Sequence, residues 1–299
     1  MTEPVRSEVS LSRLDPAAVL RARRRLQAAE APSWLHQEVA RRMAERLPMI
    51  RLKPAQVLDW SLDAGAPAEA LLSAYPQATV RQVRTEPAAA ASSWWRRWQE
   101  ARSRIQAVVP DTVPAASAGL VWSNMALHFE NDPPAVLAAW RRALQPDGFV
   151  MFSTLGPGSL AELRALYEAA GWGPAHVPFV DMHDLGDMMV QAGLADPVTD
   201  QETLTLTYGS AEQLLAELHG WGGNFSPARH PGLRTRRWRE RLLQAWRERA
   251  DAQGRIALTL ELVYGHAFQA PDRGPAVSTE TAVDLATMRR MLRAPSPRH

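Results

Sequence analysis

Residues 57–67, VLDWSLDAGAP, are the stretch of sequence that decides the fold. The apolar pair Val57 and Leu58 leads into Asp59 and then into a turn-rich segment, which is the pattern of a buried strand that enters a loop. A parallel sheet with helices on both faces places a glycine-rich ligand-binding loop at such a point, outside the carboxyl end of its first strand. This segment contains one glycine, Gly65. The sequence therefore predicts a ligand-binding loop of unusual composition.

Strands and helices alternate from this stretch toward the carboxyl end of the chain. Strands are expected at 57–60, 79–83, 105–109, 119–123, 149–155, 198–207 and 256–268. Helices are expected at 158–171, 183–192, 211–220 and 232–251, and another helix begins at Asp132 and ends before Pro146. This alternation is typical of an α/β protein with a doubly wound, Rossmann-like parallel sheet, here with helical insertions near the last strands.

Four parts of the chain differ in pattern. Residues 1–50 are predicted to form an N-terminal helical collar, in which Asp15-Pro16 starts one helix and Pro32-Ser33 precedes another. Residues 51–209 are the predicted Rossmann-like core, and 210–270 a helical cap with the final strand. Residues 271–299 are basic and proline-bearing, and we expect a flexible tail.

The composition of the chain excludes several classes of protein. Its 299 residues include no cysteine, which rules out disulfides, thiolate metal sites and a cysteine nucleophile. A hydrophobic content of 46% is ample for a core. Neither an apolar run of about 18 residues nor the apolar region of a signal peptide is present, so we expect a cytoplasmic protein without membrane attachment.

The segment SNMALHFENDPP at 123–134 follows a predicted buried strand. Ligands in doubly wound sheets bind outside the carboxyl ends of the strands, so Asn124, Leu127 and His128 are expected at the mouth of a site. A purely structural role for His128, as a cap or a packed side chain, is an equally good interpretation of its position.

Four segments, VWSNMALHF, LQPDGFVMFSTLGPGSLAELR, FVDMHDLGDMMVQAGLADPVTDQETLTLTY and YGHAF, resemble the BioC-type malonyl-[acyl-carrier-protein] O-methyltransferases of biotin synthesis. The likeness runs from about residue 118 to 269 and is much thinner before residue 57. It implies a class I methyltransferase fold with S-adenosyl-L-methionine as cofactor. It also implies O-methylation of the free carboxylate of a malonyl thioester, carried by an acyl carrier protein or by coenzyme A.

The resemblance gives the opening stretch a register. The family's D-x-G-x-G-x-G loop places Asp59 first and its glycines at Ser61, Asp63 and Gly65, so two glycines are replaced. A side chain in a glycine conformation costs roughly 1–3 kcal/mol. The family has acidic residues that contact the ribose and the adenine of the cofactor. In this sequence the corresponding positions are occupied by Arg84 and Val109, and the nearest carboxylates, Glu86 and Asp111, lie two residues later. The cofactor-binding residues implied by the resemblance are Asp59, Ser61, Asp63, Gly65, Glu86, Asp111, Asn124, Leu127 and His128.

Methyl transfer to a carboxylate needs no acid–base pair, because a carboxylic acid with a pKa near 4 is already ionised at neutral pH. We therefore assign no catalytic residue from the sequence. A cation would be needed to hold the substrate, and Arg234, Arg236 and Arg237 in the arginine-rich 229–249 segment are the candidates. The same segment would suit an acidic acyl carrier protein, or it is an ordinary solvated helix. Because no aromatic residues are interleaved with these arginines in a nucleic-acid-binding pattern, we expect no nucleic-acid partner.

Two alternatives to the methyltransferase remain. The segments SNMALHFEND, HDLGDMMVQAG and DRGPAVS also resemble the methyltransferase homologue that assembles respiratory complex I and is similar to an arginine hydroxylase. The third hypothesis is a homologue with a degenerate cofactor loop that acts as a binding or assembly protein. A metal site could be suggested by His176, Asp181, His183 and Asp184, but a helix cap by Asp181 or His183 is the better interpretation, so we expect no metal site. We also expect the protein to be a monomer.

Overall fold

The computed structural model describes residues 13–28, 33–62, 66–84 and 105–271. In this part of the chain one seven-stranded sheet has the order β3-β2-β1-β4-β5-β7-β6. Its strands are β1 (Gln56–Asp59), β2 (Thr79–Val83), β3 (Ile105–Val108), β4 (Ala118–Ser123), β5 (Leu144–Leu155), β6 (Leu194–Tyr208) and β7 (Ile256–Gln269). The first five pair in parallel and β7 runs antiparallel between β5 and β6. The predicted doubly wound class I methyltransferase sheet is confirmed.

Helices flank this sheet on both sides. They are α1 (Pro16–Ala28), α2 (Trp34–Ala44), α3 (Ala66–Ala74), α5 (Pro133–Ala143), α6 (Ala161–Ala169), α7 (Met182–Gln191), α8 (Ala211–Gly220) and α9 (Arg236–Arg247). Short 3₁₀ helices are η1 (Leu47–Met49), η2 (Pro110–Thr112) and η3 (Leu127–Phe129). Side chains of Ser33, Asp132 and Asp181 accept hydrogen bonds from the first turns of α2, α5 and α7, which explains why these helices begin where they do.

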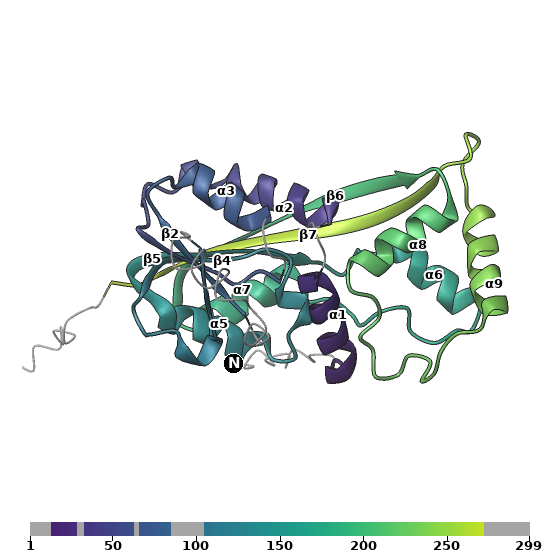
Figure 1. Ribbon diagram of the computed structural model, residues 1–299, viewed down its shortest axis with the longest axis horizontal. Helices are drawn as coiled ribbons and strands as arrows, with labels where there is room; N and C mark the ends of the chain where they lie inside the picture. The colour runs from purple at the N-terminus through teal and green to yellow at the C-terminus, as the bar shows by residue number, and fades with distance from the viewer. Residues whose placement is uncertain (1–12, 29–32, 63–65, 85–104, 272–299) are drawn as a thin grey trace, which may run out of the picture.

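Successive strand residues supply opposite faces of the sheet. In β1, Val57 packs with the core cluster that contains α2 and α3, whereas Leu58 packs with the cluster of α5 and α7. Phe149 and Val150 divide in the same way on β5. Figure 1 shows α2 and α3 above the sheet and α5 and α7 below it. This alternation is the direct consequence of the two-residue period of a strand.

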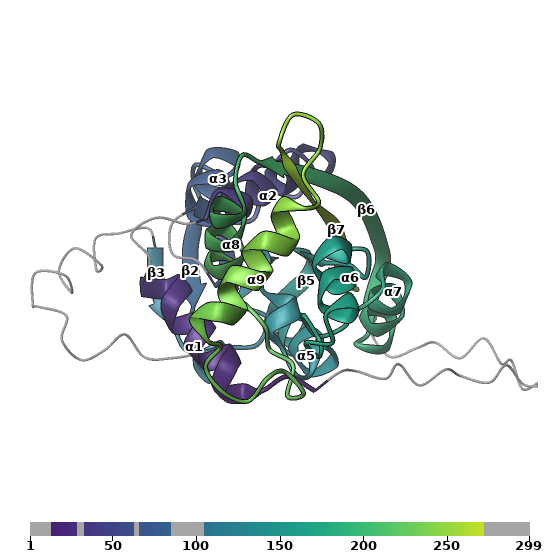
Figure 2. The ribbon, with the colours of Figure 1, turned by 90° about the vertical axis from the view of Figure 1, so that its right-hand side faces the viewer.

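The strands β6 and β7 form a long hairpin that extends beyond the parallel strands (Figure 1). At its far end lie α6, α8 and α9, which we call the cap (Figure 2). Buried Leu214 of α8 and Trp246 of α9 belong to the same core cluster as Leu258 of β7, so the cap packs directly on the hairpin. At the other end Gly265 is required by close approach, because a Cβ there would lie 2.3 Å from Cζ of Phe152.

The helix α1 joins the sheet to the cap. Arg23 donates to Glu130 Oε1 at 2.6 Å, and Arg25 donates to the carbonyl oxygen of Gly222 at 2.7 Å. Leu14 and Leu26 pack with Phe129 from the sheet side and with Phe225 from the cap side. The predicted division into collar, core and cap remains an interpretation, because these contacts run across its boundaries. Within the described residues, no helix combines the length and apolar character needed to cross a membrane.

Candidate functional site

The loops that follow β1 and β4 are tied together at the point where the strand order reverses. The buried carboxylate of Asp59 accepts the backbone N–H of Ser61 at 3.0 Å, and Ser61 Oγ accepts the backbone N–H of Asn124 at 2.9 Å. The backbone N–H of Trp60 donates to the carbonyl oxygen of Trp122 at 2.7 Å. These hydrogen bonds hold residues 59–61 against residues 122–124 at the carboxyl ends of the two strands, where ligands of doubly wound folds bind.

The side chain of Asn124, directly after β4, contacts two other elements, α2 and β5. Its Nδ2 donates to the carbonyl oxygen of His36 on α2 at 2.8 Å, and its Oδ1 accepts from Ser153 Oγ on β5 at 2.9 Å. Ser153 Oγ also accepts the backbone N–H of Met125, whose φ of 51° lies in the left-handed region. The described contacts of Asn124 are structural, and its role in cofactor binding remains a prediction.

Of the other residues predicted to bind a cofactor, the structure describes Leu127, Asp111 and His128. Leu127 is buried as the first residue of η3, and Asp111 is exposed in η2 after β3. At the end of β2, Arg84 donates to Gln82 Oε1 at 2.9 Å, so it is turned back onto its own strand. Asp63, Gly65 and Glu86 lie outside the described residues.

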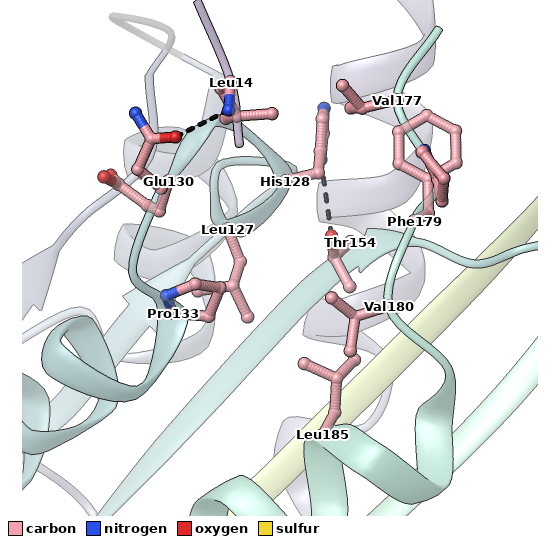
Figure 3. A pocket seen from close by; sticks show the side chains of 12 residues that line it. Leu14, Leu127, His128, Glu130, Pro133, Thr154, Val177, Phe179, Val180 and Leu185 are labelled. Carbon is pink, nitrogen blue, oxygen red and sulfur yellow. Dashed lines mark hydrogen bonds between the residues drawn. The ribbon is translucent and has the colours of Figure 1, made fainter. Parts of the chain in front are cut away.

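His128 is at the inner end of the candidate site, between β4 and β5. Figure 3 shows its ring with Nδ1 toward Thr154 Oγ1, 3.4 Å away, and the other nitrogen at the opposite end. Phe129 and Phe179 flank the ring, with centroids at 4.6 and 6.0 Å. Burial, and secondarily the nearby His36, lowers the pKa of His128 to about 3. His128 is therefore neutral near pH 7.

A cavity of about 310 Å³ extends from His128 to the cap. Its wall is mainly apolar and aromatic, with Leu155 from β5 and with Tyr167, Leu218 and Trp238 from the cap helices among the contributors. His128 also borders a smaller cavity of about 40 Å³ beside Leu14 and Asn131 (Figure 3). The main cavity is of the kind that takes an apolar ligand with a few polar groups.

Two more histidines line the main cavity. Burial lowers the pKa of His176, and burial followed by the charge of Arg25 lowers that of His219. His176 stacks on Phe179 with ring centroids 4.9 Å apart, and its Nδ1 is 2.6 Å from the carbonyl oxygen of Val177. Because a carbonyl oxygen only accepts, Nδ1 carries the proton and Nε2 has a lone pair.

The predicted substrate arginines lie outside the cavity. Arg234 donates to the carbonyl oxygen of Trp172 and lies over the ring of Trp238. The side chain of Arg236 is 93% exposed and pairs with Glu240, and Arg237 is exposed as well. Their role as substrate ligands remains a prediction that this geometry does not favour. Arg239, another arginine of the 229–249 segment, lines the cavity instead.

The acidic and histidine residues near α7 cap a helix. Asp181 accepts the backbone N–H of His183 at 2.8 Å and also contacts His183 Nδ1, as expected for a cap. The described residues contain no group of three or more His, Asp or Glu side chains arranged for a metal ion. Trp60, directly after β1, packs edge-on against Trp140 of α5, with the ring centroids 6.4 Å apart.

Sequence reasoning missed the residues that complete the site. Ser153 and Thr154 are polar side chains inside an otherwise apolar buried strand, and this was the available signal. Trp221 had no such signal, and the arginine-rich 229–249 segment did not distinguish Arg239 from its neighbours, because the cavity they line is assembled from helices that are far apart in the sequence.

Comparisons with known proteins agree with this geometry. A family model described as a methyltransferase domain matches residues 33–197. The malonyl-[acyl-carrier protein] O-methyltransferase of Gallionella capsiferriformans (strain ES-2) is 36% identical over 267 residues, which cover 86% of this chain and 91% of the relative. The enzyme of the same name from Laribacter hongkongensis (strain HLHK9) is 39% identical over 247 residues, covering 79% and 82%. Among solved structures, the YcgJ protein of Bacillus subtilis covers 81% of this chain and 100% of its own at a TM-score of 0.52 and 13% identity, which shows a shared fold.

Proposed function

The chain belongs to the malonyl-[acyl-carrier protein] O-methyltransferase family, and from this premise we propose that it methylates the free carboxylate of a malonyl thioester in biotin synthesis, with S-adenosyl-L-methionine as methyl donor. The observation that carries the proposal is the apolar cavity, which begins at His128 beside the cofactor crevice and opens toward the cap. The comparisons give no support to the hydroxylase or to the assembly protein.

The described part of the crevice fits the cofactor. It lies at the reversal of strand order between β1 and β4, and Asp111 presents an exposed carboxylate after β3, which is separated from β1 by β2. Ser61 and the backbone around Asn124 would border the amino-acid part of the cofactor. Bound S-adenosyl-L-methionine supplies an electrophilic methyl group on a sulfonium.

The cavity suits a reaction in which opposite charges disappear. A carboxylate and a sulfonium are charged before methyl transfer, and the ester and thioether are neutral after it. Apolar walls such as Leu155 and Trp238 exclude water, which would otherwise solvate the carboxylate and oppose the reaction. The residues of the cavity therefore have to orient the substrate more than to transfer protons.

We place the acyl carrier protein on the outer side of α9. Arg237 is exposed there, and Arg239, on a different side of the helix, is exposed where α9 borders the cavity; within the described residues neither is held in an ion pair. Through Arg239, the exposed surface of α9 is therefore continuous with the route to His128. Clustered guanidinium groups attract an acidic carrier protein and accelerate its association.

The test is methyl transfer to malonyl carrier protein, followed by mass spectrometry of the acyl group. We expect a mass gain of one methylene unit that is lost on mild ester hydrolysis, and faster turnover with the carrier protein than with malonyl-CoA. Calorimetry with S-adenosyl-L-methionine and S-adenosylhomocysteine runs in parallel. Cofactor binding without transfer to either malonyl thioester would overturn the substrate assignment, and no binding at millimolar ligand would favour the degenerate-loop hypothesis.

A further inference from the structure

The ring nitrogen of His128 that faces away from Thr154 has no partner within the described residues. Nδ1 lies 3.4 Å from Thr154 Oγ1, and Nε2 is at the other end of the ring (Figure 3). His128 borders both the small and the main cavity. Its free nitrogen is therefore available to a ligand at the inner end of the site.

The tautomer of His128 can follow the ligand. A threonine hydroxyl either donates to a bare Nδ1 or accepts from a protonated one, so Thr154 is compatible with both neutral tautomers. A carboxylate is an acceptor only, and it is repelled by a lone pair on Nε2. A bound carboxylate therefore selects the form in which Thr154 donates to Nδ1 and Nε2 carries the hydrogen.

A neutral donor suits the reaction better than a cation. The negative charge of the carboxylate decreases in the transition state, so a fixed positive charge beside it would stabilise the ground state more than the transition state. A neutral N–H holds the oxygen in place with less of this penalty. Arg239 is exposed and lines the cavity on the side of the cap, so no positive charge is placed beside His128 by this arginine.

His176, which also lines the cavity, is not suited to donate a hydrogen bond to the carboxylate. His176 donates from Nδ1 to the carbonyl oxygen of Val177, at 2.6 Å, so its Nε2 is an acceptor, and that atom is buried without a partner in the described structure. An acceptor would repel a carboxylate. His128 is thus the ring whose hydrogen-bond partner leaves Nε2 free to donate.

We propose that His128 is a catalytic residue that donates Nε2–H to the carboxylate oxygen of the malonyl group, and that Thr154 is a positioning residue that stabilises this tautomer by donating its hydroxyl to Nδ1. The inference rests on the proposed function and adds the group that recognises the reacting carboxylate. It also predicts that the malonyl group enters carboxylate first, with the thioester toward the cap.

The test compares His128→Gln with His128→Asn, because the amide N–H of glutamine can reach the position of Nε2 and that of asparagine cannot. A hydrogen bond to a charged group corresponds to a factor of about 10 to 100. We expect His128→Gln to retain kcat/KM for malonyl carrier protein within about 5-fold and His128→Asn to lose about 10- to 100-fold. Cofactor affinity, measured by calorimetry, should be unchanged in both variants, because this proposal places His128 against the substrate and not, as the sequence resemblance implies, against the cofactor. Equal activity of the two variants, whether high or low, would overturn the inference.

Thr154→Val and Thr154→Ser test the positioning role. Valine removes the hydroxyl and serine keeps it, so we expect loss of kcat/KM in the first and recovery in the second. Nitrogen NMR of the imidazole in the enzyme with S-adenosylhomocysteine and malonyl carrier protein should show Nε2–H in the wild type and a mixture of tautomers in Thr154→Val. An unchanged tautomer in Thr154→Val would overturn this part. If the wild-type protein binds the cofactor but transfers no methyl group, the proposed function itself is wrong. If the wild type is active and the two His128 variants have equal activity, only the inference about His128 is wrong.

Discussion

Ser153 on β5 donates a hydrogen bond to Asn124 at the end of β4, with 2.9 Å between Ser153 Oγ and Asn124 Oδ1. Ser153 Oγ also accepts the backbone N–H of Met125 at 3.0 Å. One hydroxyl thus fixes the start of the segment that carries His128. The position of His128 at the inner end of the cavity therefore depends on the hydrogen bond between Ser153 and Asn124.

Replacing Ser153 by alanine should therefore damage both stability and activity. The change leaves Asn124 Oδ1 without this donor inside the core, which costs about 1–3 kcal/mol in the free energy of unfolding. Urea denaturation and kcat/KM are the measurements. Ser117→Ala is the matched control, because Ser117 Oγ is buried without a hydrogen-bond partner in the described structure. Equal effects of the two substitutions would contradict the role assigned to Ser153.

Acidification should destabilise the protein through His128, which is half-buried. Burial lowers the pKa of His128 to about 3, whereas the unfolded chain has a histidine pKa of about 6.5. Below about pH 6.5 the unfolded state therefore binds a proton that the folded state does not, and the free energy of unfolding falls as the pH decreases. His128 alone should account for about 2 kcal/mol between pH 6.5 and 5.

The measurement for this prediction is urea denaturation at both pH values. His128→Gln should flatten the dependence, because glutamine takes up no proton. His230→Gln, on an exposed segment, serves as the control and should keep the slope of the wild type. The same slope in His128→Gln as in the wild type would show that His128 does not contribute.

Reversing charge on α9 should weaken the carrier-protein reaction selectively. The double substitution Arg237→Glu and Arg239→Glu replaces two exposed guanidinium groups of α9, of which Arg239 borders the cavity, by carboxylates that repel an acidic carrier protein. We expect KM for malonyl carrier protein to rise by about 5-fold or more at low salt, and the difference to shrink at high salt. Arg142→Glu, on the exposed side of α5, is the control and should leave KM unchanged. A similar rise with malonyl-CoA would point to a role inside the cavity instead of at the docking face.

Much of the fold was predictable, because strand burial and helix caps are local signals. Val57 and Leu58, the β5 segment around Phe149, and Asp181 as a cap all have the expected roles. The site was predictable only in part. His128 follows a strand end and was identified, whereas the partner of Trp60 depends on a contact with Trp140 that is 80 positions away in the sequence.

The arginines of α9 show why the residues that line the cavity could not be predicted from the sequence. The sequence predicts a helix from 232, but α9 begins at Arg236. A helix places successive residues about 100° apart, so its rotation decides which of several adjacent arginines faces inward. Arg239 lines the cavity, while Arg236 is exposed, because tertiary packing of Leu242 and Trp246 sets that rotation.

Filling the cavity should separate substrate binding from cofactor binding. Leu163 of α6 is buried and lines the cavity, so Leu163→Trp adds bulk where the acyl thioester would lie. We expect kcat/KM for malonyl carrier protein to fall by about 10-fold or more, since overpacking of this size costs about 1–3 kcal/mol. Calorimetry should find the affinity for S-adenosylhomocysteine unchanged, because the crevice between β1 and β4 is lined by other residues. Val190→Trp, at a position that is 57% exposed on α7, is the control for adding a large aromatic side chain. Full activity of Leu163→Trp, with the folded state confirmed by denaturation, would mean that the malonyl group reaches His128 by another route.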